Sequence, residues 1–174
     1  NPYFVDLEEF ISNGWLTKKE CDKVDFGDDE NSVDYELQYK NRFTLLRKAF
    51  KKSGIIEDKN FKKYVKDNSF WLENYALFMT LKGIYKGKSF MEWKEDDRLK
   101  KPAAIKKFKA DEKNQKEILF WEFLQYMFFS QWYKLKNYAN EKGIKIIGDI
   151  PIYVALDSAD TWANPELFMF DRDR

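Results

Sequence analysis

Apolar side chains recur every three or four residues along much of this sequence, the spacing that places them on one face of an α-helix. One such run predicts a long helix over residues 34–52, with a buried stripe formed by Tyr35, Tyr39, Phe43, Leu46 and Phe50. Nearer the N-terminus, Thr17 and Glu20 stand three residues apart, which predicts a capping box at the start of a short helix.

The longest predicted helix runs through Leu119 to Asn140. Its apolar residues form a stripe made of Ile118, Trp121, Leu124, Phe128, Trp132, Leu135 and Ala139. Phe120, Phe123 and Met127 widen this stripe beyond one face. A helix that is apolar over most of its circumference is normally buried between several neighbours, and we expect that here.

The hydrophobic period changes after Gly143, where a compact, largely β-branched run extends from Ile144 to Ile150. Such a run is typical of a buried strand in a parallel sheet, and it is the only strand that the sequence predicts. A parallel strand needs partners from other crossover units. We therefore expect a mainly α chain that contributes one strand to a larger sheet. The abrupt apolar start at Asn1-Pro2 also leads us to expect an internal part of a longer protein.

Composition removes several classes of function. The 174 residues hold 31 Lys and Arg against 30 Asp and Glu, so the chain lacks the basic excess that nucleic-acid binding requires. No apolar run approaches the roughly 20 residues that span a bilayer, and no signal peptide opens the chain. We expect neither a nucleic-acid nor a membrane partner.

The residue inventory also limits the chemistry. Cys21 is the single cysteine, which excludes an internal disulfide and a cysteine-rich zinc site. The chain has no His, which excludes catalytic triads and histidine-rich metal sites. We expect no metal site, and catalysis is left to carboxylates, Lys, Tyr or an external cofactor.

Asp149 lies at the end of the predicted strand, where barrels and open α/β sheets collect their active sites. A carboxylate in an apolar run needs a partner to offset its desolvation. The alternative is an Asp that only caps the loop backbone. Further along, Asp157 or Ser158 is predicted to cap a short helix, and Asn164 is predicted to cap another with Pro165 at its first position.

Several blocks of the sequence together resemble the amylomaltase or 4-α-glucanotransferase family, whose plant members are called disproportionating enzymes. The most specific block runs from Gly148-Asp149-Ile150-Pro151 to Trp162-Ala163-Asn164-Pro165-Glu166-Leu167-Phe168. The other blocks are Asn1-Pro2-Tyr3, Val33-Asp34-Tyr35 with Tyr39, Phe70-Trp71-Leu72-Glu73, and Phe128-Phe129-Ser130-Gln131-Trp132. They follow one collinear order over the whole chain.

The resemblance implies a glycosyltransferase of carbohydrate metabolism that is built on a (β/α)8 TIM barrel with insertions. Residues 1–142 would be a helical insertion between early barrel strands, and residues 143–174 would hold a barrel strand, the following loop and a short helix. Members transfer α-1,4-glucan segments by a retaining double displacement with an Asp nucleophile and a Glu acid/base, without a cofactor. The family's nucleophile lies in an Arg-x-Asp-His motif. Because this chain has no His, we expect no catalytic residue within it and no activity from it alone.

Two residues match functional positions of the family. Asp149 matches an Asp that supports the floor of the active site without being the catalyst. Val154 stands where the wider clan often has a His, so that sugar contact is not expected here. Tyr39 matches a Tyr of a secondary glucan-binding groove through the spacing Asp34-Tyr35-x-x-x-Tyr39. Its place on the predicted stripe leaves a core role as the alternative.

The resemblance also implies a cytoplasmic protein whose partners are α-1,4-glucans, namely maltooligosaccharides and dextrins of starch or glycogen. We further expect self-association through the exposed edges of the predicted strand. Two other functions stay open: a non-catalytic helical module that binds glucan or protein, and a hydrolase of the same glycoside hydrolase clan that transfers to water.

Overall fold

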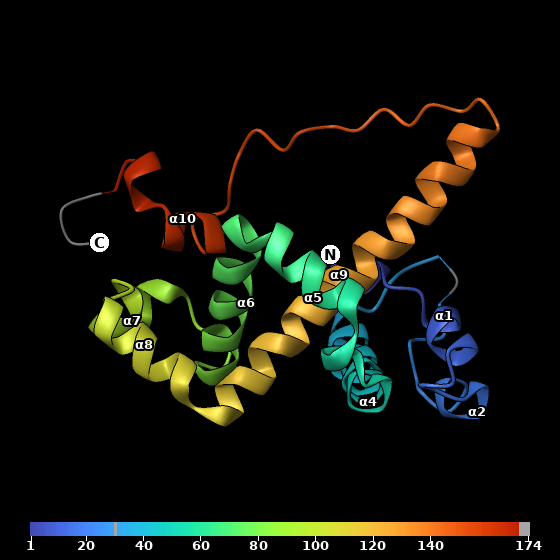
Figure 1. The fold of residues 1–174 in the computed structure, drawn as a ribbon, viewed down its shortest axis with the longest axis horizontal. Helices are drawn as coiled ribbons and strands as arrows, with labels where there is room; N and C mark the ends of the chain where they lie inside the picture. The colour runs from blue at the N-terminus through green and yellow to red at the C-terminus, as the bar shows by residue number, and fades with distance from the viewer. Residues whose placement is uncertain (30, 171–174) are drawn as a thin grey trace. The chain divides into compact units, whose positions relative to one another are not determined.

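A computed structural model of the chain describes residues 1–29 and 31–170, and no β-strand occurs among them (Figure 1). The α-helices are α1 (Leu7–Ser12), α2 (Lys18–Cys21), α3 (Tyr35–Leu37), α4 (Phe43–Ser53), α5 (Lys59–Asp67), α6 (Ser69–Ile84), α7 (Glu95–Arg98), α8 (Pro102–Ala110), α9 (Glu112–Glu141) and α10 (Ala159–Ala163). Short 3₁₀ turns are η1 (Pro2–Phe4), η3 (Ile55–Glu57), η4 (Phe90–Glu92) and η5 (Pro165–Leu167), and η2 (Gln38–Arg42) is a π-helical turn. The prediction of a mainly helical chain is confirmed.

The described residues divide into two compact units. The first unit comprises the described parts of residues 1–64 and 123–146, and the second comprises residues 65–122 and 147–170. Helices α5 and α9 each begin in one unit and end in the other. Each unit has its own aromatic core.

Phe123 lies at the centre of the first unit's core. Its ring stacks on Phe10 at 5.8 Å between centroids and lies 5.3 Å from Phe50, so α9 packs against α1 and α4. The predicted capping box at α2 is confirmed: the Thr17 N–H donates to Glu20 Oε2 at 2.8 Å, and the Glu20 N–H donates to Thr17 Oγ1 at 3.3 Å.

The core of the second unit gathers around Trp162 of α10. The buried residues of this cluster are Leu77, Phe78, Leu81, Phe90, Trp93, Ile105 and Trp162. The Trp162 indole lies 5.8 Å from Phe78 and donates its N–H to the Asp97 carbonyl at 2.9 Å. A buried indole needs such a partner for its one polar atom. Ser158 is the N-cap of α10, in a capping box with Thr161.

The predicted helix over residues 34–52 is not one regular helix, because η2 separates α3 from α4. A π turn takes up one more residue per hydrogen-bonded ring than an α turn, so it rotates the residues before it relative to those after it. Leu46 on α4 is buried, whereas Tyr35 and Tyr39 are 69% and 63% exposed. The prediction that both tyrosines belong to a buried stripe is therefore wrong.

Helix α9 confirms the longest predicted helix, but only part of it is buried on all sides. The side chains at residues 120–125 and Met127 are buried, whereas Phe128 and Trp132 are half-buried and Leu135 is 57% exposed. The N-terminal segment covers this later face only in part: Phe4 and Asp6 line a pocket together with Phe128, Trp132 and Leu135. The sequence predicts burial from every side for the full stripe, whereas in the structure the fully buried part ends at Met127.

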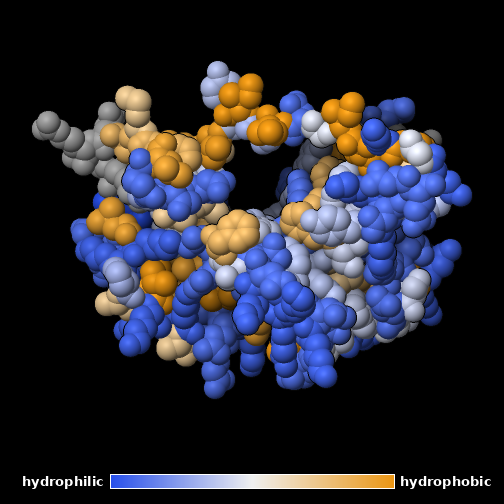
Figure 2. Space-filling model, turned by 45° about the horizontal axis from the view of Figure 1, so that its top comes forward, coloured by the Kyte–Doolittle hydropathy of each residue, from blue (hydrophilic) through white to orange (hydrophobic). Residues whose placement is uncertain are grey.

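The strand predicted at Ile144–Ile150 is not formed in the structure. These residues have no regular secondary structure, and all of them are exposed, with Ile147 at 95% and Ile150 at 82%. A strand exists only where a neighbouring strand pairs with its N–H and C=O groups, and no such strand occurs among the described residues. The space-filling view shows this segment as a hydrophobic run at the surface (Figure 2).

Candidate functional site

Tyr39 belongs to an aromatic surface of the first unit that also contains Tyr3, Tyr35 and Phe43. The ring of Phe43 lies 5.3 Å from Tyr39 and 5.9 Å from Tyr3, and Tyr3 meets Tyr35 edge-on at 6.3 Å. Burial, and then the nearby Tyr39 phenol, raise the pKa of Tyr3. Tyr35 and Tyr39 thus expose their rings above a half-buried aromatic base, an arrangement that can stack on an apolar sugar face.

The π turn η2 positions this aromatic surface and is tied to the rest of its unit. Asp34 caps α3 by accepting the Leu37 N–H at 2.9 Å. Within η2, the Asn41 side chain donates to the Asp25 carbonyl at 2.7 Å, and the Arg42 guanidinium donates to the Val5 carbonyl. These bonds hold the turn against the preceding loop and the N-terminal segment, and they fix the backbone that carries Tyr39.

Asp149 lies in the extended segment of the second unit and is exposed. Its carboxylate accepts the Ile150 N–H at 2.8 Å, and no ion pair joins it to a described residue. This local bond matches the backbone-capping alternative for Asp149. Tyr39 and Asp149 belong to different units, and each is considered as a separate site.

Asp157, which was a candidate cap, has a different role. Its carboxylate forms an ion pair with Lys82 of α6 and accepts the Phe90 N–H at 3.1 Å. It therefore joins α6 and η4 to the segment that leads into α10. Part of the sequence block that resembles the glucanotransferases thus has a structural task within the second unit.

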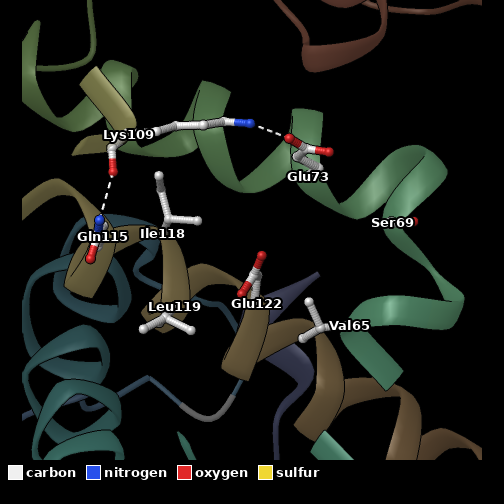
Figure 3. A pocket seen from close by; sticks show the side chains of 8 residues that line it. All are labelled: Val65, Ser69, Glu73, Lys109, Gln115, Ile118, Leu119 and Glu122. Carbon is white, nitrogen blue, oxygen red and sulfur yellow. Dashed lines mark hydrogen bonds and ion pairs between the residues drawn. The ribbon is translucent and has the colours of Figure 1, made fainter. Parts of the chain in front are cut away.

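A pocket that sequence reasoning missed lies within the second unit (Figure 3). It has a volume of 420 Å³, and its lining residues are Val65, Ser69, Glu73, Lys109, Gln115, Ile118, Leu119 and Glu122. Glu122 is only 8% exposed, and its carboxyl group points into the pocket between the aliphatic side chains (Figure 3). The signal in the sequence was a single carboxylate between Trp121 and Phe123 in the apolar run of α9.

The carboxyl group of Glu122 titrates far from its ordinary range. Burial, and then the charge of Glu73, raise its pKa to about 7, and Lys109 acts weakly in the opposite direction. Glu73 is itself paired with Lys109, whereas Glu122 forms neither a hydrogen bond nor an ion pair with a described residue. A buried acid without a partner lowers the stability of the folded protein, and such groups often belong to functional sites.

Within residues 1–29 and 31–170 the structure offers neither a metal cluster nor a membrane-spanning helix. No group of three His, Cys, Asp or Glu residues there is arranged to hold a metal ion. No helix of the described chain has both the length and the apolar character that crossing a bilayer demands.

Comparison with known proteins gives matches over the whole chain. The sequence profile described as 4-alpha-glucanotransferase matches residues 1–174. The 4-alpha-glucanotransferase of Clostridium butyricum is 42% identical over 173 residues, which cover 99% of this chain and 35% of that protein. The 4-alpha-glucanotransferase of Thermus thermophilus is 37% identical over 177 residues, which cover 99% of this chain and 34% of that protein.

Solved structures give the same picture. An amylomaltase from Streptococcus agalactiae in complex with acarbose matches with a TM-score of 0.90 at 32% identity, over 99% of this chain and 35% of that one. The chain therefore spans about a third of the length of the relatives that it matches.

Proposed function

The chain belongs to the 4-alpha-glucanotransferase family, and from this premise we propose that it is part of an enzyme that transfers α-1,4-glucan segments to an acceptor glucan. The observation that carries the proposal is the match of the entire chain, in sequence and in fold, to proteins of that name and to an amylomaltase. Its substrates would be maltooligosaccharides and dextrins of starch or glycogen, and the protein would act in the cytoplasm.

The proposed mechanism is a retaining double displacement, in which an Asp forms a glycosyl-enzyme and a Glu acts as acid and then as base. Both carboxylates would lie in the part of the protein outside these 174 residues. In support, the chain has no His for the family's Arg-x-Asp-His nucleophile motif, and it spans about a third of its relatives.

In this proposal the parent fold is a (β/α)8 barrel, with residues 1–142 as a helical insertion and residues 143–174 as a barrel segment. The run from Ile144 to Ile150 would pair with other barrel strands in the longer protein. Its exposed isoleucines support this placement, because a buried parallel strand needs apolar side chains on both faces.

Asp149 would then lie at the end of that strand and support the floor of the active site. Tyr39 would bind glucan away from the catalytic cleft. The exposure of the Tyr39 ring, and its place beside Tyr35 and Phe43, support this second role.

Activity assays test the proposal. The full-length protein that contains this sequence is expected to convert maltotriose into glucose and longer maltooligosaccharides, whereas the purified 174-residue chain is expected to release no glucose above a buffer blank. A full-length protein that releases only glucose and maltose, without longer products, would be the hydrolase. Glucose release by the 174-residue chain would contradict the placement of the carboxylates outside it.

The aromatic surface favours one further candidate, a helical module that binds glucan without catalysis. In that case the full-length protein would bind long maltodextrins but would form no transfer products. The same maltotriose assay, run beside a maltodextrin-binding measurement, separates the two functions.

A further inference from the structure

The pocket around Glu122 has a chemical character that narrows what it can bind. Val65, Ile118 and Leu119 give it aliphatic walls, and no aromatic side chain lines it (Figure 3). Sugars are commonly held by stacking on aromatic rings, and this pocket offers none. Its volume of 420 Å³ falls within the range of pockets that hold small molecules.

The charges in the pocket do not cancel once Glu122 ionises. Glu73 from α6 and Lys109 from α8 form an ion pair, and the Gln115 side chain donates to the Lys109 carbonyl at 2.9 Å. Glu73 and Lys109 are the charged groups of the neighbouring helices that act on Glu122. When Glu122 ionises, its negative charge therefore has no neutralising partner. The residue is only 8% exposed, and its carboxylate lies beside the aliphatic walls.

These features exclude other ligands. An anion would meet two carboxylates and a lysine that is already paired. A metal ion requires a cluster of ligands, and no suitable group of three was found among the described residues. A cation with an apolar body satisfies both the charge and the walls, since its ammonium group donates to a carboxylate while its alkyl chain covers aliphatic side chains.

We propose that this pocket is a binding site for a short primary alkylammonium ion, whose ammonium group pairs with Glu122 and whose alkyl chain lies against Val65, Ile118 and Leu119. The site is independent of glucan transfer. Binding is linked to pH, because the carboxyl group must lose its proton to form the ion pair. The ammonium group keeps its charge throughout the neutral range, so Glu122 is the group that sets this dependence.

The test is calorimetric titration of the full-length protein with n-pentylammonium chloride at pH 6 and pH 8. We expect saturable binding that is about tenfold tighter at pH 8, because the ionised share of a carboxyl group with a pKa near 7 rises about tenfold over that range. n-Pentanol, which has the same shape without the charge, is expected not to bind. Absence of saturable binding, or equal binding at both pH values, would overturn the proposal.

Three variants make the test specific. Glu122→Gln keeps the shape of the side chain and is expected to weaken binding at least about tenfold and to remove the pH dependence. Leu119→Phe fills the pocket while keeping the carboxyl group, and it is expected to abolish binding. Glu112→Gln, on an exposed position of the same helix, is the matched control and is expected to bind as the unchanged protein does. Unchanged binding by both Glu122→Gln and Leu119→Phe, in variants whose circular dichroism is unaltered, would place the amine elsewhere.

Discussion

At the scale of single residues, Glu122 links the stability of the protein to pH. Its pKa is about 7 in the folded state, against 4.5 for an ordinary glutamate, so the native state binds this proton more tightly than the unfolded chain does. The stability that this proton gives to the folded state is fully present below pH 4.5 and is lost as pH rises through 7.

We therefore predict that Glu122→Gln stabilises the protein at pH 8 by about 2–3 kcal/mol and changes its stability little at pH 5, because glutamine stays neutral at both. Urea unfolding at the two pH values measures the difference. A variant whose stability varies with pH as much as that of the unchanged protein would show that Glu122 is not the group responsible.

Tyr39 gives a second prediction at this scale. Because its ring is 63% exposed, Tyr39→Ala is expected to lower stability by well under about 1 kcal/mol. Phe123→Ala, at the centre of the first unit's core, is expected to cost about 3–5 kcal/mol. Thermal unfolding of the two variants gives the comparison.

Glucan affinity separates the proposed role of Tyr39 from simple exposure. In the full-length protein, Tyr39→Ala is expected to weaken binding of long maltodextrins. Tyr138→Ala, at a tyrosine of α9 that is 62% exposed, is the matched control and is expected to leave that binding unchanged. Equal effects of the two substitutions would remove Tyr39 from the glucan site.

At the scale of the helices, α10 depends on its first turn. It is only five residues long, and Ser158 Oγ accepts the Thr161 N–H at 3.3 Å at its start. Loss of such a cap typically costs about 1 kcal/mol. We predict that Ser158→Ala lowers the free energy of unfolding by about that amount, measured by urea unfolding followed through tryptophan fluorescence. Ser32→Ala, in an exposed loop of the other unit, is the control and is expected to have a smaller effect.

Local signals in the sequence predicted the helices well. The capping box of Thr17 and Glu20 and the course of α9 both depend on residues a few positions apart, and both are confirmed. The π turn η2 was not predictable, because an apolar stripe keeps its approximate period when one extra residue is taken up within it.

Features that depend on distant partners were the ones that sequence reasoning missed. The pairing of Ile144–Ile150 requires other strands, and the burial of Leu135 requires a neighbour for α9. The same holds for the site: Glu122 was overlooked because its pocket is assembled from α5, α6, α8 and α9, whereas the exposure of Tyr39 followed from a local turn. The roles of Asp149 and Tyr39 in glucan transfer stay predictions.

At the scale of the whole molecule, the exposed apolar run from Ile144 to Ile150 favours self-association of the protein. No strand pairs with the backbone of this run among the described residues, and an unpaired strand edge promotes pairing between copies. We predict that the 174-residue chain associates with increasing concentration and that Ile147→Lys reduces this association, as measured by sedimentation velocity. Ile84→Lys replaces an exposed isoleucine outside the segment and is expected to leave the association unchanged.

The π turn between α3 and α4 makes the aromatic surface sensitive to the number of residues in this turn. Deleting a single codon within Gln38–Arg42 would convert the turn into ordinary α-helix and turn the preceding residues by about 100° around the helix axis. Tyr35 would then leave its place beside Tyr3, although every aromatic residue outside the deletion would still be present. Insertion or deletion of one residue in this turn can therefore create or remove the aromatic surface without the substitution of any tyrosine.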